Sequence, residues 1–151
     1  MKEFLKEILP DVRTTDDVRE VMRVLGALEE RHYKLFINSE KKSSDSMPFG
    51  SLSKRIAELI PEGAADENKF FSHAKETLKR LPVLVMEVAF EPDEAAIRKI
   101  SNWTRDNINP HLILEIERER SLGGGARLYF GGRFFEDNLE QMVNRAVRRG
   151  L

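Results

Sequence analysis

The chain has 151 residues, of which 40% are hydrophobic and 34% are charged, and its formal net charge is −1. This length allows one domain or two small ones with a real hydrophobic core. The near-neutral charge gives no global electrostatic reason to expect nucleic-acid binding. The absence of cysteine excludes disulfides, thiol nucleophiles and thiolate metal sites. No apolar run reaches the roughly 18 residues of a membrane-spanning helix, and the charged N-terminus is not typical of a signal peptide, so we expect a soluble intracellular protein.

The first eighty residues show only patterns of helix and loop. Apolar residues recur there at spacings of three, four and seven, which is typical of helices that bury one face. Proline closes two of these helices, at Pro10 and Pro61, and Ser51 is expected to cap the third helix. Residues 40–48 lack periodicity and are predicted to form an exposed loop. The predicted helices span residues 2–9, 16 to 37 or 38, 51–60 and 66–81.

The pattern changes between Leu81 and Pro82, where we place a domain boundary. Residues 83–90 are nearly all apolar and rich in β-branched side chains, which predicts a central, mostly buried strand. A helix start follows at residues 91–94, because proline suits a first helical turn and acids oppose the helix dipole. Residues 111–118 alternate between apolar and charged side chains, which is typical of a half-buried strand. The buried stripe of the intervening helix is predicted to be Ala96, Ile97, Ile100, Trp103 and Ile108.

Two clusters of glycine flank the apolar run at residues 126–130. Glycine adopts positive φ without a Cβ penalty, so each cluster is predicted to form a sharp turn or a place of close packing. The pair Gly131-Gly132 is a two-residue hairpin signal between this run and a strand at residues 133–135. Asn138 then stands where the N-cap of a last helix belongs. The predicted turn and cap residues are Gly124, Gly125, Gly131, Gly132 and Asn138.

Together these elements predict an α+β protein with two domains. Residues 1–81 form a helical domain of about four helices, and residues 82–151 form a small mixed sheet in the order β-α-β-β-β-α. The last predicted helix carries an apolar stripe, which either covers the sheet or binds a partner helix. The stripe comprises Leu139, Met142, Val143, Ala146 and Val147.

The residues that carry chemistry form no recognisable catalytic or metal-binding pattern. The glycines at residues 123–125 invite comparison with a phosphate-binding loop, but such a loop continues into Lys-Ser/Thr and a helix, whereas a strand follows here. None of the histidines, at His32, His73 and His111, has another histidine at a ligand spacing. No Gly-x-Ser-x-Gly nucleophile motif is present. We therefore expect no catalytic residue, no cofactor and no metal.

A small group of arginines suggests the alternative function. Arg145, Arg148 and Arg149 complement the dipole of the last predicted helix, and with Arg127 and Arg133 they could contact RNA. No aromatic and basic RNA-binding motif accompanies them. The alternative is thus a stand-alone regulatory or RNA-associated α+β binding module. The observation that would distinguish this alternative is salt-dependent RNA binding that charge reversal at Arg127, Arg133 and Arg145 abolishes.

The second half of the chain resembles the C-terminal domain of the delta subunit of F-type ATP synthase, which in mitochondria is called the oligomycin-sensitivity-conferring protein. In that family a strand, an acid-rich helix start, an amphipathic helix and an alternating strand lead into the sequence Ser-Leu-Ile-Gly-Gly. A short strand, a tight turn and the start of the last helix follow. The matching segments here are residues 83–90, 91–94, 97–103, 112–117, 121–126 (Ser-Leu-Gly-Gly-Gly-Ala), 132 and 136–139.

The resemblance implies a non-catalytic subunit of the peripheral stalk, which takes part in ATP synthesis and proton transport. Such a subunit links the catalytic head to the membrane-anchored stator and resists the torque of the rotor. In the family the C-terminal domain meets the stalk b subunit, and an N-terminal helical bundle grips the alpha subunits. The implied partners are therefore the b subunit and the alpha subunits. The implied location is cytoplasmic, at the inner or plasma membrane through the ATP synthase complex and without membrane insertion.

Overall fold

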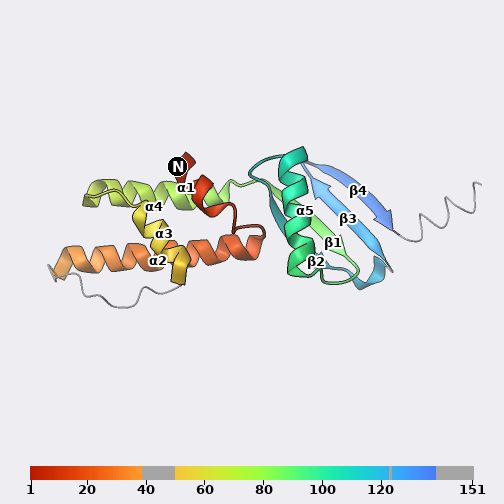
Figure 1. The fold of residues 1–151 in the computed structure, drawn as a ribbon, viewed down its shortest axis with the longest axis horizontal. Helices are drawn as coiled ribbons and strands as arrows, with labels where there is room; N and C mark the ends of the chain where they lie inside the picture. The colour runs from red at the N-terminus through yellow and green to blue at the C-terminus, as the bar shows by residue number, and fades with distance from the viewer. Residues whose placement is uncertain (39–49, 123, 139–151) are drawn as a thin grey trace, which may run out of the picture. The chain divides into compact units, whose positions relative to one another are not determined.

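The computed structural model describes residues 1–38, 50–122 and 124–138. Over these ranges the fold is α+β, as the sequence predicts, with helices in the first half and a four-stranded mixed sheet in the second (Figure 1). The chain divides into two compact units. One comprises Met1–Val12 and Asp16–Leu81, and the other comprises Arg13–Thr15 and Pro82–Leu151.

The helices of the first unit follow the predicted pattern, with small shifts at their ends. Helix α3 begins at Gly50, so Ser51 lies inside its first turn and is not the cap that the sequence suggested. Helix α4 begins at Ala64, directly after Gly63, two residues earlier than predicted. The predicted loop at residues 40–48 lies outside the described residues. The four helices are α1 (Lys2–Ile8), α2 (Thr15–Asn38), α3 (Gly50–Glu58) and α4 (Ala64–Lys79).

The helices of the first unit bury one apolar core. Phe4 of α1 meets Phe70 of α4 edge to face, with ring centroids 5.8 Å apart, and Phe71 lies at the same centroid distance from Phe70. Edge-to-face pairs contribute to stability beyond the area that they bury. The core is therefore aromatic where α1 and α4 meet. Its buried apolar residues are Phe4, Ile8, Val12, Val21, Val24, Leu25, Leu28, Ile56, Phe70, Phe71, Ala74, Leu78 and Leu81.

Arg55 of α3 joins this helix to the end of α1. Its guanidinium donates to the Asp11 carboxylate at 2.7 Å and to the Glu7 carbonyl oxygen at 2.6 Å. We expect Arg55→Met, which keeps the aliphatic stem but removes both hydrogen bonds, to lower the free energy of unfolding by about 1 kcal/mol. Urea denaturation followed by circular dichroism measures this loss. Arg80→Met is the control, because Arg80 is exposed and, within the part of the chain that the structure describes, its side chain pairs with nearby Glu76 alone. An equal loss there would contradict the bridging role.

The second unit is a four-stranded sheet with one helix on its face (Figure 1). The strand order is β2-β1-β3-β4, with β1 parallel to β2 and the other neighbours antiparallel. Strand β1 is central, as its apolar sequence predicts. The elements are β1 (Val83–Val88), α5 (Glu94–Asn107), β2 (Ile113–Arg118), the 3-10 helix η1 (Arg120–Leu122), β3 (Gly125–Phe130) and β4 (Arg133–Asn138).

The outer edge of β2 is extended by residues that precede α2. The Leu114 N–H donates to the Arg13 carbonyl oxygen at 2.8 Å, and Thr14 forms a parallel bridge to Leu114. On its other side, β2 pairs with β1, so both edges of β2 near Leu114 are hydrogen-bonded. This contact explains why Arg13–Thr15 belong to the second unit.

Both ends of the sheet differ from the sequence expectation. Strand β1 ends at Val88, so Phe90 lies beyond it and is 67% exposed, although the alternation places it on the buried face. Strand β4 runs to Asn138 and not to residue 135, because the ladder with β3 continues until Asn138 pairs with Gly125. Backbone pairing overrides the polar character of these last residues. The predicted helix after Asn138 lies outside the described residues.

The buried face of α5 is rotated from the predicted stripe. Trp103 is 61% exposed and Ile108 is 44% exposed, whereas Ser101 and Thr104 are buried. Residues 97, 101 and 104 are spaced four and three apart, so they lie on one face of the helix. Position 103 lies to the side of that face. The prediction is confirmed for Ile97 and Ile100, which pack against the core, and is wrong for Trp103 and Ile108, because it followed hydrophobicity and not the position of each residue around the helix. The core of this unit comprises Leu84, Leu112 and Leu114, against which Ile97, Ile100, Ile116, Leu128 and Phe130 pack.

Ser101 provides a test of this packing. Its side chain is fully buried, and its hydroxyl has no hydrogen-bond partner among the described residues. A buried hydroxyl without a partner is costly, and alanine is the better helix former, so Ser101→Ala should raise the free energy of unfolding by about 1 kcal/mol. Chemical denaturation measures this gain. Thr104→Val should instead lower stability, because the Thr104 hydroxyl donates to the Ser101 carbonyl oxygen at 3.0 Å. Equal effects of the two variants would contradict this assignment.

Candidate functional site

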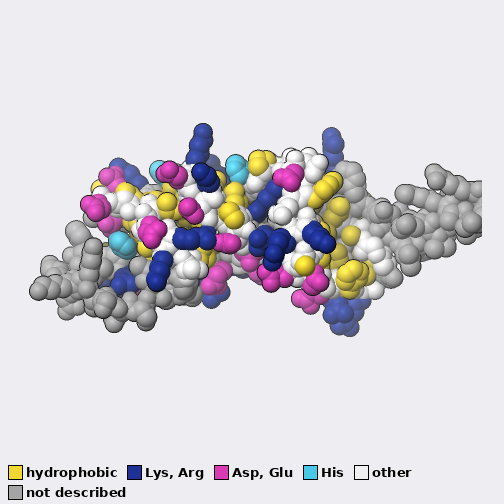
Figure 2. Space-filling model, in the orientation of Figure 1, with side chains coloured by type: hydrophobic (Ala, Val, Ile, Leu, Met, Phe, Trp, Pro, Cys, Tyr) yellow, Lys and Arg dark blue, Asp and Glu magenta, His cyan; other side chains and the backbone are white. Residues whose placement is uncertain are grey.

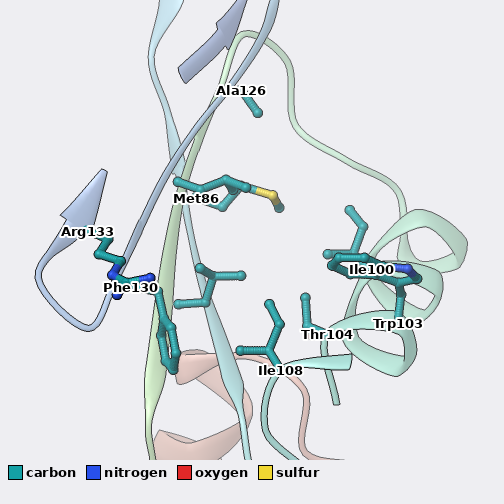
Figure 3. Close-up of a pocket in the computed structure, with 10 residues that line it drawn as sticks. Met86, Ile100, Trp103, Thr104, Ile108, Ala126, Phe130 and Arg133 are labelled. Atoms are coloured by element: carbon teal, nitrogen blue, oxygen red, sulfur yellow. The ribbon is translucent and has the colours of Figure 1, made fainter. Parts of the chain in front are cut away.

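A cavity of about 570 Å³ lies between α5 and the sheet (Figure 3). We call it the α5 groove. Its walls are almost entirely apolar and come from β1, α5 and the residue after it, β3 and the start of β4. Figure 3 shows the Met86 side chain reaching from the sheet toward α5, where Ile100 and Trp103 lie. The lining residues are Leu84, Met86, Ile100, Trp103, Thr104, Ile108, Ala126, Leu128, Phe130 and Arg133.

The groove exists because one helix is too narrow to cover this sheet. Four strands spaced about 4.8 Å apart span about 14 Å between the outer strand axes, whereas a helix is about 10 Å across. Helix α5 packs over Leu84 and Leu114 of the β1 and β2 side. The β3 residues that pair with Met86 and Val88 on the same face, Leu128 and Ala126, are only half-buried, although Met86 and Val88 themselves are buried. The sheet face over β3 is therefore only partly covered.

Large apolar side chains are exposed around the groove. Trp103 stands at its rim on α5, and hydrophobic side chains are visible beside α5 and over the hairpin of β3 and β4 (Figure 2). Contiguous apolar surface of this kind in a folded unit marks a place where another element docks. The groove carries no group suited to acid–base chemistry, since Thr104 and Arg133 are its only polar lining residues. Its apolar lining suits an apolar occupant.

The opposite face of the sheet is mixed in character. Arg127 forms an ion pair with Glu87 at 3.4 Å, and the rings of Tyr129 and Phe134 lie 4.9 Å apart. Arg133 pairs with Phe130 and lines the groove, so it lies on the other face from Arg127. Of the five arginines considered for RNA binding, Arg127 and Arg133 are thus on opposite faces, and the other three lie outside the described residues.

The glycine hairpin sets the path of the chain next to the groove. Gly131 and Gly132 have φ of 56° and 75°, the two positive values that a two-residue hairpin turn requires. Gly124 and Gly125, at the start of β3, have φ of 147° and 89°. These four residues form the two bends that bring β3 back along β1 and β4 back along β3. Asn138 is the last residue of β4.

The turn glycines can be tested by substitution. We expect Gly131→Ala to lower the free energy of unfolding by about 1 kcal/mol, because a side chain at positive φ is strained. No atom lies within 4 Å of the position that a Cβ would take, so backbone strain accounts for the whole effect. Thermal denaturation measures it. Gly131→Asn is the matched control, since asparagine tolerates this conformation, and it should lose only a few tenths of that energy. A larger loss for asparagine than for alanine would overturn the explanation.

Glu119 holds the connection between β2 and the first glycine bend. Its carboxylate accepts a hydrogen bond from the Ser121 N–H at 2.9 Å. Hydrogen bonds from Ser121, and less strongly the charge of Arg127, lower the pKa of Glu119 from its ordinary value. A carboxylate with a lowered pKa in the folded state stabilises the fold above its ordinary pKa. This contribution is lost as the pH falls through the lowered value. At neutral pH, Glu119 is therefore ionised and accepts the Ser121 hydrogen bond in the segment that joins β2 to β3.

The described residues contain no group of three or more histidine, aspartate or glutamate side chains that could hold a metal ion. His32 lies in the helical unit, where its Nδ1 is 3.3 Å from a carboxylate oxygen of Glu67 and its ring contacts Phe71. His73 and His111 are exposed. Within the same ranges, no helix is long and apolar enough to cross a membrane. The α5 groove is therefore the strongest candidate site in this part of the chain.

Sequence reasoning identified the glycine bends but missed the groove. The apolar stripe that it proposed for partner binding (Leu139, Met142, Val143, Ala146 and Val147) lies outside the described residues. The available signal for the groove was the β3 alternation of Ala126, Leu128 and Phe130, which needs a covering element on one face. No protein-family model matches the chain, and no match is found among curated proteins.

Proposed function

We propose that this chain is a non-catalytic, delta-like subunit of the peripheral stalk of an F-type rotary ATP synthase. It links the catalytic head to the membrane-anchored stator and resists the torque of the rotor. The observation that supports this proposal is the architecture of the second unit. A parallel strand–helix–strand unit is followed by a glycine hairpin that adds two antiparallel strands, which is the order that the resemblance to the delta family implies.

The chemistry of the described residues is compatible with a static link. A joint between head and stator requires surfaces that hold other proteins, and it requires no reacting group. In this proposal the α+β unit meets the stalk b subunit and the helical unit meets the alpha subunits. The complex then holds the chain at the cytoplasmic side of the inner or plasma membrane.

Affinity purification of the tagged chain from detergent-solubilised membranes tests the proposal. The ATP synthase alpha and b subunits should be recovered together with it. A chain that is recovered abundantly and alone would count against the proposal. The same preparation tests the alternative, because RNA that is retained at low salt and lost after charge reversal at Arg127 and Arg133 would favour an RNA-associated module.

Deletion of the gene provides a functional test. Without a link between head and stator, the head turns with the rotor, so ATP hydrolysis continues but no longer drives proton pumping. We therefore expect membranes from the deletion strain to keep ATP hydrolysis and to lose ATP-driven acidification. Restoring the gene should restore pumping. Unchanged pumping in the deletion strain would exclude a necessary stalk role.

A further inference from the structure

The α5 groove has the size of a small-molecule site. Its volume of about 570 Å³ lies within the range of pockets that hold small ligands, roughly 300–1,000 Å³. All of its lining residues belong to the second unit, so the cavity lies within one compact body. Water in a cavity with so few polar groups finds few hydrogen-bond partners, and an apolar ligand displaces it at little cost.

The one charged side chain of the lining stands at one end of the groove. Arg133 pairs with Phe130 across the hairpin of β3 and β4, whereas Ala126 lies at the other end of the same strand (Figure 3). The Arg133 side chain is exposed, and none of the ion pairs found among the described residues involves it. A carboxylate at this end of the groove would therefore gain a charge-assisted, bidentate partner without breaking an existing ion pair.

The other polar lining residue, Thr104, favours a ligand whose remaining length is apolar. Its hydroxyl already donates to the Ser101 carbonyl oxygen at 3.0 Å. A second polar group of the ligand, placed beside Thr104, would lose its water without gaining that hydrogen as a partner, and such a loss is costly. The lining thus suits a molecule with one anionic end and a hydrocarbon tail.

The length of the groove sets the length of this tail. The four steps along β3 from Ala126 to Phe130 cover about 13 Å. An extended hydrocarbon chain advances about 1.25 Å per carbon, from C–C bonds of about 1.5 Å at near-tetrahedral angles. About ten carbons therefore reach from one end of the groove to the other, and the carboxylate and its neighbouring carbon extend to Arg133.

We propose that the α5 groove binds a free fatty acid of about twelve carbons, with its carboxylate on the Arg133 guanidinium. The tail runs along β3, between Leu128 of the sheet and Trp103 of α5, and ends near Ala126. This proposal does not depend on the function proposed above, because it concerns a cavity of the second unit alone.

Trp103 reports on binding, because it is the only tryptophan of the chain, lines the groove and is 61% exposed. In the delipidated full chain, saturating dodecanoate should shift its fluorescence to shorter wavelength and reduce acrylamide quenching several-fold. The dissociation constant should fall about tenfold for every two carbons from octanoate to dodecanoate. It should change little from dodecanoate to hexadecanoate, because further carbons extend beyond the groove. An affinity that rises equally over the whole series would contradict a site of this length.

The head group is tested with Arg133→Gln. This variant should weaken dodecanoate binding about tenfold, because it removes a charge-assisted hydrogen bond, and should leave the binding of uncharged methyl dodecanoate unchanged. Arg98→Gln is the matched control, since Arg98 is an exposed arginine of α5 outside the groove lining, and it should alter neither ligand. Circular dichroism checks that both variants remain folded. Equal losses for acid and ester, or no loss for either, would overturn the assignment of the carboxylate to Arg133.

Other occupants of the groove would give different results, and each of these results would overturn the proposal. If Trp103 is already shielded in the delipidated chain and no fatty acid shifts its fluorescence, protein fills the groove. Shielding that disappears on dilution would then identify a second copy, and shielding that persists would identify another part of the same chain. Vesicles of anionic phospholipid that bind the chain when soluble dodecanoate does not would assign the groove to a membrane surface.

Discussion

Phe71→Ala should lower the free energy of unfolding of the helical unit by about 4 kcal/mol, because removing a buried phenylalanine costs its transfer free energy and leaves a cavity. Phe71 is almost fully buried on α4. Its ring lies 5.8 Å from that of Phe70 and 5.9 Å from that of His32. Both edge-to-face contacts are lost together with the buried area.

Urea denaturation followed by the helical circular dichroism signal measures this effect. Tyr33→Ala is the matched control, because Tyr33 belongs to α2 in the same unit and is 65% exposed. Its removal should change stability by less than about 0.5 kcal/mol. If both aromatic residues contribute equally, Phe71 is not part of a close-packed core.

Leu114→Ala is expected to lower the free energy of unfolding of the sheet unit by about 3 kcal/mol. Leu114 is fully buried on β2 and forms the core of this unit with Leu84 and Leu112. Hydrogen bonds to β1 and to Arg13 hold its backbone on both sides, so the strand cannot move inward to fill the space. The backbone bonds survive the substitution, and the loss measures side-chain packing alone.

Chemical denaturation monitored by Trp103 fluorescence and circular dichroism provides the measurement. Ile116→Ala is the control, since Ile116 lies two residues further along the same face of β2 but is only half-buried. We expect about half the loss or less there, because less area is buried. A loss at Ile116 equal to that at Leu114 would show that the core does not centre on Leu84 and Leu112.

Much of the fold could be predicted because its signals are local. The apolar, β-branched residues 83–88 form the central strand, and the two glycines at 131 and 132 form the hairpin turn with positive φ. The predictions failed where contacts between strands determine the end of an element. Strand β4 extends to Asn138 because β3 offers pairing partners.

The groove could not be predicted from the sequence, since it depends on where two distant segments meet. Trp103 and Ile100 are both apolar residues of α5, but their exposure depends on which side of the helix faces β1. Likewise, Arg127 and Arg133 are close in sequence and lie on opposite faces only because of the register of the hairpin.

By itself, the sequence determined the fold class, the order of the strands along the chain and the tight turn between β3 and β4. These features follow from local periodicity and from the backbone freedom of glycine. Only the tertiary structure decided that the hairpin pairs with β1 on the side away from β2. Because β3 therefore lies on the far side of β1 from β2, its half-buried face forms one wall of the α5 groove. Exposure depends on neighbours distant in sequence, which local patterns do not encode.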